Sequence, residues 1–190
     1  MTRILIMGPP GAGKGTQAAA IAGRFDIPSI STGAIFRANV DAGTELGKTA
    51  RRYLEAGEYV PDEITNEMVR DRISQADCKS GFLLDGYPRT LDQVAALDAI
   101  LASSGVSLDA VVSLEVDLQE LVRRLLERAG VEERSDDTET VVRRRQEVYA
   151  EETAPLLAEY DARGLLLRVG GGDTMARVSG RVFEALGIRV

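Results

Sequence analysis

The sequence contains no histidine, no tryptophan and only one cysteine, Cys78. Without histidine, the Ser-His-Asp and Cys-His arrangements of nucleophilic catalysis cannot be assembled, and the usual zinc sites of cysteine and histidine are excluded as well. A single cysteine cannot form an intramolecular disulfide, so Cys78 is interpreted as an inert thiol. Any chemistry that this chain performs must therefore proceed without an imidazole group.

Long apolar runs and net positive charge are also missing. The longest early apolar run, residues 4–7, is too short for a membrane-spanning helix or for the core of a signal peptide. The net charge of -7, with only five Tyr and four Phe, argues against binding of a nucleic-acid backbone or of stacked single-stranded bases. We therefore expect a cytoplasmic protein that binds neither membranes nor nucleic acid. Anionic ligands are expected to bind only where cations cluster.

The length of 190 residues and the apolar content of 44% suit one compact domain. Short apolar runs alternate with amphipathic stretches, and this pattern predicts a parallel sheet with crossover helices, hence an α/β fold. The five expected strands are residues 4–7, 28–31, 82–85, 110–115 and 165–169. A polar break at residues 129–137, between two long helical patterns, is the expected surface flap.

A glycine-rich loop, GPPGAGKGT at residues 8–16, follows the first expected strand and leads into a helical stretch. Strand, glycine-rich loop and helix form the context of a phosphate-binding P-loop, because glycines let successive backbone N–H groups point into one concavity. Lys14 is placed to reach the outer phosphates. Gly15 stands where the common pattern has Ser or Thr, and Thr16 follows one position later. The competing dinucleotide pattern, begun at Gly11, fails because it requires glycine at position 16.

The third expected strand ends at Asp85 and continues as Gly86-Tyr87-Pro88-Arg89. A carboxylate at the carboxyl end of a strand beside the P-loop strand is suited to hold the water shell of Mg²⁺, although an aspartate there also serves as a turn or helix-capping residue. Arg89, in a rigid turn, is a candidate for bidentate phosphate binding, with a solvated loop arginine as the alternative.

A helical period over residues 138–152 places Arg145 near the centre of an apolar stripe. The stripe consists of Val141, Val142, Val148 and Tyr149. A charged group on such a stripe is costly unless an anion pairs with it. Arg145 is therefore either a buried ion-pair partner or a ligand-binding cation that faces a cleft.

Other cations carry less information by themselves. Arg124 and Arg128, four residues apart on the preceding helical stretch, share one helix face, and a solvated surface explains them as well as a ligand does. Thr32 begins a helical excursion that extends to Asp62, and physical reasoning alone makes it an N-cap and Arg37 an ordinary helical cation.

Taken together, these stretches resemble the adenylate kinase family over essentially the whole chain. The matched motifs are GPPGAGKGT, ISTGAIFR, GEYVPDEIT, GFLLDGYPRTLDQ, the Arg124/Arg128 pair and RSDDTETVVRRR. The resemblance implies a three-layer P-loop α/β fold with a five-stranded parallel sheet as its core (residues 1–30, 61–126 and 138–190), a helical AMP-binding excursion at residues 31–60 and a short lid at residues 127–137. A lid this short is typical of a bacterial class without the metal-binding insertion, so no structural zinc is expected.

The resemblance also implies the roles of individual residues. For ATP binding it implies Gly11, Ala12, Gly13, Lys14, Gly15, Thr16, Arg124, Arg128 and, as a backbone contact to adenine, Gly172. For AMP binding it implies Thr32, Arg37, Glu58, Tyr59, Val60, Gly86, Tyr87, Pro88, Arg89, Gln93, Arg134 and Arg145, with Gln93 at the adenine edge. As catalytic groups it implies Lys14, Arg89, Arg124, Arg128, Arg134 and Arg145, with Asp85 holding Mg²⁺ through water. The run from Gly170 to Asp173 departs from the commoner family pattern.

The activity that the resemblance implies is reversible, Mg²⁺-dependent transfer of the terminal phosphoryl group of ATP to AMP, giving two ADP. The partners would be these nucleotides alone, and the enzyme would be a monomer. Such a transfer suits a chain without histidine, because the attacking AMP phosphate is already anionic and needs positioning and charge neutralisation rather than a base.

Two alternatives share the same motifs. A UMP/CMP kinase or a GTP-using relative would keep the P-loop and the turn at Arg89, and by resemblance Thr32 and Gln93 favour adenine over these. A P-loop nucleotide sensor without activity is the second alternative, and the presence of Lys14, Asp85 and the arginines argues against it.

Overall fold

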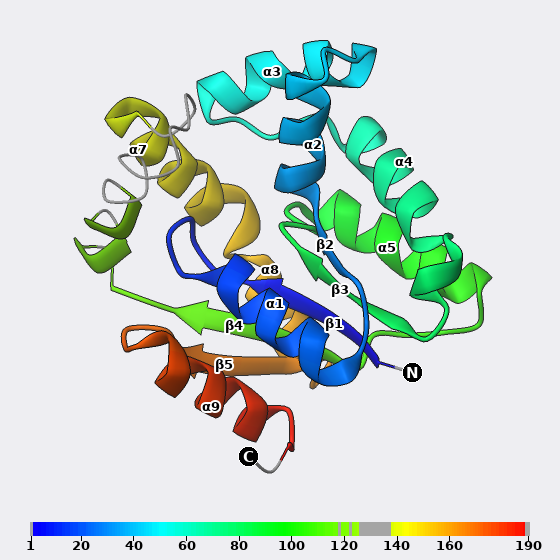
Figure 1. Cartoon of the computed structure of the whole chain (residues 1–190), viewed down its shortest axis with the longest axis vertical. Helices are drawn as coiled ribbons and strands as arrows, with labels where there is room; N and C mark the ends of the chain where they lie inside the picture. The colour runs from blue at the N-terminus through cyan, green and yellow to red at the C-terminus, as the bar shows by residue number, and fades with distance from the viewer. Residues whose placement is uncertain (1, 118, 122, 126–137, 189–190) are drawn as a thin grey trace.

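The computed structural model describes residues 2–117, 119–121, 123–125 and 138–188 (Figure 1). Five parallel strands form one sheet in the order β2-β3-β1-β4-β5. The strands are β1 (Thr2–Met7), β2 (Ser29–Ser31), β3 (Gly81–Asp85), β4 (Ala110–Glu115) and β5 (Leu166–Gly170). The predicted α/β fold with a five-stranded parallel sheet is confirmed, although β1 begins earlier and β5 lies one residue further along the chain than expected.

Helices connect and flank these strands. They are α1 (Lys14–Phe25), α2 (Thr32–Asp41), α3 (Glu45–Ala56), α4 (Asp62–Ile73), the 3₁₀ helix η1 (Ala76–Cys78), α5 (Leu91–Ser103), α7 (Glu139–Val148), the π-helical turn η2 (Tyr149–Thr153), α8 (Leu156–Ala162) and α9 (Met175–Ala185). Residues 119–121 and 123–125 are also helical. The helix expected over residues 138–152 is thus α7 followed by the π-helical turn. Within the described residues, no helix is both long and apolar enough to cross a membrane.

The sheet is covered by helices on both faces, as Figure 1 shows, with α1 and α9 on one side and α5 and α8 on the other. Because successive strand residues point to opposite faces, Ile4 packs in a cluster with Ile21 of α1, and Leu5 packs in a second cluster with Leu97 of α5. Both strand residues are essentially inaccessible to solvent. These two apolar layers fix the sheet and leave its carboxyl edge, where the loops gather, free for a ligand.

Helices α2 and α3 form an excursion that extends away from the sheet, at the top of Figure 1. This excursion has its own small apolar cluster around Phe36, Ala50 and Val60. Thr44 caps α3 by accepting a hydrogen bond from the backbone N–H of Gly47, and Gly57 ends α3 in the left-handed conformation. The partly buried Ile64 and Met68 of α4 pack against this cluster, so α4 connects the excursion with the rest of the molecule.

Candidate active site

A cavity of about 610 Å³ lies at the carboxyl ends of β1 and β3 and is bounded by the excursion and by α7. In open parallel sheets, ligands bind in the crevice outside the carboxyl ends of the strands. Most of the site residues expected from the sequence line this cavity: Gly11, Gly13, Lys14, Gly15, Thr16, Arg37, Glu58, Tyr59, Asp85, Gly86, Tyr87, Pro88, Arg89, Arg124 and Arg145. Folding therefore brings together groups that are far apart in the sequence.

The glycine-rich loop has the backbone geometry of a phosphate cradle. Gly8, Gly11 and Gly13 have φ angles of 143°, 88° and 89°, which side-chain-bearing residues rarely adopt. Lys14 begins α1, and its ammonium group donates to the carbonyl oxygens of Gly8 at 2.7 Å and of Pro9 at 3.0 Å. The first turn of α1 contains no acidic residue. The positive end of the helix dipole is therefore left to a bound anion.

Asp85, the expected partner of the Mg²⁺ water shell, lies at the carboxyl end of the strand beside β1. It ends β3, and its partner in the neighbouring strand is Ile6 of β1, two residues before the P-loop. Its side chain is half-buried and lines the cavity, and no hydrogen bond to its carboxylate is formed within the described part of the chain. The described residues hold no group of three or more His, Cys, Asp or Glu that could bind a metal by themselves.

The cavity collects cations from separate elements. Arg37 comes from α2, Arg89 from the turn after β3, Arg124 from the helical residues 123–125, and Arg145 from α7. Together with Lys14 they surround one volume in a protein whose net charge is -7. Arg128, Arg134 and the predicted lid at 127–137 lie outside the described residues. Such a local concentration of positive charge in an acidic chain suits a polyanionic ligand.

Arg89 is held in place on three sides. Its Nε donates to the carbonyl oxygen of Gly86 at 2.7 Å, and its guanidinium group lies 4.7 Å from the centre of the Tyr59 ring. The hydroxyl of Thr153 donates to the carbonyl oxygen of Arg89 at 2.9 Å and is hydrogen-bonded to the Tyr59 hydroxyl at 2.8 Å. The guanidinium fork is thereby oriented before any ligand binds.

A second, smaller recess of about 30 Å³ adjoins the cavity and shares Tyr59 and Arg89 with it. Thr32, Val60 and Gln93, which were expected in the AMP site, line this recess rather than the main cavity. Thr32 and Gln93 are each 1% exposed, and the Thr32 hydroxyl donates to the Gly86 carbonyl oxygen at 2.9 Å. The recess is therefore narrow, with fixed hydrogen-bonding groups among apolar wall residues such as Phe36 and Leu54.

Two phenols near these pockets are fixed in the protonated form. Burial raises the pKa of Tyr87 well above its usual range, and its hydroxyl donates to Asn66 at 2.6 Å. Burial likewise raises the pKa of Tyr149, which lines the main cavity, to about 12. Neither tyrosine is a candidate base near neutral pH.

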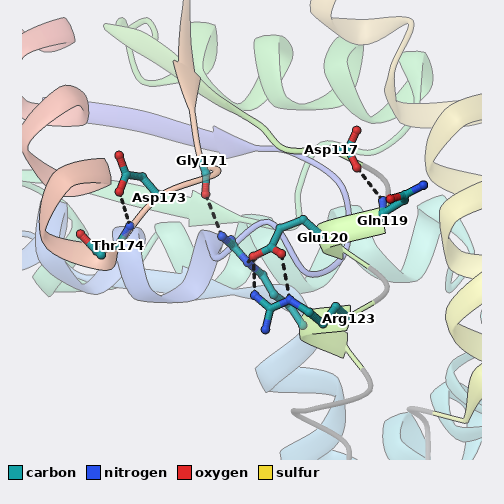
Figure 2. A network of polar contacts seen from close by, with 8 residues as sticks. Asp117, Gln119, Glu120, Arg123, Gly171, Asp173 and Thr174 are labelled. Atoms are coloured by element: carbon teal, nitrogen blue, oxygen red, sulfur yellow. Dashed lines mark hydrogen bonds and ion pairs between the residues drawn. The ribbon is translucent and has the colours of Figure 1, made fainter.

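Arg124 connects the cavity with the loop that follows β5. Its Nε donates to Glu120 at 2.7 Å, and its Nη2 donates to the carbonyl oxygen of Gly171 at 3.1 Å. Arg123 also contacts Glu120 (Figure 2), and hydrogen bonds from Arg123 and Arg124 lower the pKa of Glu120 to about 2. Glu120 therefore stays ionised and keeps Arg124 oriented.

The loop itself is closely packed at Gly171 and open at Gly172. A Cβ atom at Gly171 would lie 2.7 Å from Cγ2 of Val116, so a side chain there would have to displace the Val116 methyl group. Gly172, the expected adenine contact, is exposed, and a Cβ atom there would meet nothing within 4 Å. Asp173 then accepts a hydrogen bond from the Thr174 N–H at 2.8 Å, beside the start of α9 (Figure 2). A flat ligand group has space against Gly172.

Helix α7 links the cavity to both the P-loop and the excursion. Val142 and Val148 are buried as expected, whereas Arg145 is half-buried, lines the cavity and donates from Nη2 to the Leu54 carbonyl oxygen at 3.4 Å. Gln146 donates to the carbonyl oxygen of Pro10 in the P-loop at 2.8 Å. A helix in contact with both the P-loop and the excursion is well placed to align two ligands.

Sequence reasoning missed several residues that orient the site. Thr153 is polar, yet it is only 4% exposed. A polar residue on a buried helical face is also the signal that singled out Arg145. Gln146 and Glu120 act through contacts that have no sequence signature, since their partners are Pro10 and Arg124. Asp62 was missed as well, because in the sequence it is an ordinary acidic residue in the first turn of a helix.

Comparison with known proteins agrees with this geometry. The family model described as "Adenylate kinase" matches residues 6–165. The chain is 59% identical to the adenylate kinase of Nocardioides sp. over 186 residues, which covers 98% of this chain and 97% of that protein. It is 57% identical to the adenylate kinase of Kocuria rhizophila over 98% of this chain and 99% of that protein. The identity to the adenylate kinase of Thermobifida fusca is 53%, over 97% of each chain.

Proposed function

The chain belongs to the adenylate kinase family, and we propose that its 610 Å³ cavity is the place where ATP and AMP react. The enzyme catalyses reversible, Mg²⁺-dependent transfer of the terminal phosphoryl group of ATP to AMP, giving two ADP. The observation that carries the assignment of the cavity is the convergence of Lys14 and four arginines, from separate elements of an acidic chain, on one volume. Two nucleotides bring several negative charges together, and such a cluster neutralises them.

The proposed ATP half of the site is built on the P-loop. Backbone N–H groups between Gly11 and Thr16 bind the phosphates, and Lys14 exchanges its present carbonyl partners for the transferred phosphoryl group. Arg124 contacts the phosphates from the other side, and the open backbone at Gly172 receives the adenine. The remaining expected ATP ligand, Arg128, belongs to the same proposal and lies outside the described residues.

The proposed AMP half combines the excursion with the turn after β3. Arg37 and Arg89 bind the AMP phosphate, and the recess lined by Thr32, Val60 and Gln93 accepts the adenine. Arg145 reaches the phosphate groups of both nucleotides from α7. Arg134, which lies outside the described residues, is assigned the same task on the resemblance. Because the AMP phosphate is anionic at neutral pH, no protein base is required.

Mg²⁺ bound to ATP would neutralise phosphate charge, and Asp85 would hold its water shell. The half-buried Asp85 carboxylate at the cavity wall supports this role. The chain's own residues would perform the rest by orienting the two phosphates in line. The expected lid at residues 127–137, which lies outside the described residues, would exclude water by closing over the core and the excursion at 31–60. Exclusion of water matters because water would otherwise accept the phosphoryl group and waste ATP.

The proposed partners are small nucleotides alone, and the proposed working unit is a monomer in the cytoplasm. The acidic net charge of -7 disfavours binding to nucleic-acid phosphates. Among the described residues, the exposed large hydrophobic side chains are Leu91 and Met175, which lie on different helices, so an apolar interface on these residues is unsupported.

The substrate assignment is tested with a coupled assay for ADP formation, using ATP and Mg²⁺ with AMP, CMP, UMP or GMP in turn. We expect AMP to be preferred by a wide margin in kcat/KM, because the recess offers fixed polar groups for one base. A preference for UMP or CMP would identify the chain as a pyrimidine-nucleotide kinase, and absence of turnover with all four would favour a nucleotide sensor.

We further expect the enzyme to contain no structural zinc. The sequence has no histidine and a single cysteine, which is buried and accepts a hydrogen bond from Arg72 at 3.0 Å. Elemental analysis of the purified protein should find substoichiometric zinc, and EDTA should leave the melting temperature of the nucleotide-free enzyme unchanged. A zinc atom per chain, or a melting temperature that falls on chelation, would contradict this expectation.

A further inference from the structure

The Gln93 amide at the wall of the small recess is bonded on both of its polar atoms. Its Oε1 accepts a hydrogen bond from the backbone N–H of Arg89 at 2.7 Å, and its Nε2 donates to the Asp62 carboxylate at 2.6 Å. The side chain is only 1% exposed. An N–H group requires an acceptor and a carboxylate requires a donor, so only one of the two orientations of the amide satisfies both partners.

Asp62 is itself fixed. The Thr90 hydroxyl donates to its second carboxylate oxygen at 2.6 Å, and the same hydroxyl accepts from the backbone N–H of Gln93 at 3.1 Å. Asp62 begins α4 and Thr90 caps α5, so the three side chains join the starts of two helices. Both oxygens of the Asp62 carboxylate thus accept hydrogen bonds, and the carboxylate cannot rotate away from the Gln93 amide without losing them.

We infer that Asp62 is a specificity-determining positioning residue, which selects adenine by holding the Gln93 amide in a single orientation. This inference rests on the proposed binding of the AMP base in the recess. After its two protein bonds, Gln93 retains one hydrogen on Nε2 and one lone pair on Oε1. Adenine offers the complementary pair, an acceptor at N1 and an amino donor at N6.

Hypoxanthine reverses that pattern while keeping the shape of the base. In IMP, N1 carries a hydrogen and position 6 carries an oxygen, so the amide held by Asp62 would face donor against donor and acceptor against acceptor. Rejection of IMP would require that the amide cannot turn over. A buried amide that turned over would lose the bonds to Arg89 and Asp62, and unsatisfied buried groups are costly.

The test is Asp62→Asn, which keeps the side-chain size and replaces one of the two acceptor oxygens with an NH₂ donor, so that residue 62 no longer presents an acceptor to both Gln93 and Thr90. We expect the KM for AMP to rise by about tenfold or more and the ratio of kcat/KM for AMP to that for IMP to fall by about tenfold or more, with the KM for ATP unchanged. Glu63→Gln is the matched control, because Glu63 is an exposed carboxylate in the same first turn of α4. It should alter none of these values.

A parallel Gln93→Leu variant separates the inference from the proposal on which it rests. If folded Gln93→Leu kept the preference for AMP over IMP, the assignment of the recess to the base would be wrong, and the inference with it. If Gln93→Leu lost the preference while Asp62→Asn kept it, the role of Asp62 alone would be overturned.

The same question can be asked of the unaltered enzyme, should Asp62→Asn fail to fold. The Gln93 side-chain amide, observed by NMR, should exchange its hydrogens with solvent far more slowly than the amide of exposed Gln119, because burial and the hydrogen bond from Nε2 to Asp62 protect it. Exchange of the Gln93 amide at the rate of the Gln119 amide would show that Asp62 does not hold it, and would overturn the inference.

Discussion

Replacing Lys14 with methionine is expected to lower kcat by about 10²–10⁵-fold, the range found for groups that stabilise charge on a transferring phosphoryl group. The Lys14 ammonium group lies at the start of α1, where it is bonded to the carbonyl oxygens of Gly8 and Pro9. In the presence of ATP, the same ammonium group would meet the charge that develops during transfer. Steady-state kinetics with saturating ATP and AMP measures the effect.

The fold should survive this substitution. Lys14 is half-buried, and its hydrogen bonds to the Gly8 and Pro9 carbonyl oxygens are only partly buried, so the free energy of unfolding should fall by no more than about 2 kcal/mol. Lys79→Met, at an exposed lysine away from the cavity, is the matched control and should keep normal turnover. Turnover near that of the unaltered enzyme in folded Lys14→Met would disprove the P-loop assignment.

Arg145→Met is expected to lower kcat by at least about 10²-fold while leaving the stability of the fold nearly unchanged. Methionine keeps most of the side-chain volume and removes the charge. Arg145 is half-buried and lines the cavity, where it can face a ligand, and one of its hydrogen bonds, to the Leu54 carbonyl oxygen, is long, at 3.4 Å. Because its interaction would be strongest with the transferring phosphoryl group, the loss should appear in kcat and in kcat/KM alike.

A structural role for Arg145 would give the opposite result. If Arg145 served mainly to neutralise a buried carboxylate, its removal would destabilise the fold by about 3–5 kcal/mol and leave kcat in place. Denaturant melts and kinetics on the same variant decide between the two. The control is Arg143→Met on the same helix, since Arg143 is exposed and its ion pair with Glu139 lies on the surface, where such pairs contribute little.

Local patterns in the sequence were sufficient to predict the strands of the sheet and the phosphate-binding loop. The strands are short apolar runs, and each was found within a few residues because both faces of a parallel sheet are buried and its strands read as continuous apolar segments. The glycine-rich loop was found because its φ angles demand glycine at Gly8, Gly11 and Gly13. The anomaly at Arg145 was visible because helical periodicity shows which positions should be apolar.

Contacts between distant segments could not be read from such patterns. Thr153 bonds to Arg89, which lies 64 residues earlier, and Gln146 bonds to Pro10, 136 residues earlier. Neither pair has a sequence spacing that favours contact. The pairing is decided by how α7 and the π-helical turn pack against the sheet edge. The contact between Gln93 and Asp62, which are 31 residues apart, could not be predicted either, because the family resemblance implies a role for Gln93 but not for Asp62.

The sequence by itself determined the sheet, the phosphate-binding loop and the family, because each depends on residues close together in the chain or on motifs in a fixed order. Only the tertiary structure decided which cations share one cavity, which groups fix Arg89 and Arg124, and which way the Gln93 amide faces. The physical reason is that charge neutralisation and hydrogen-bond direction depend on distances and angles between elements, and those are set by the packing of the two apolar layers on the sheet.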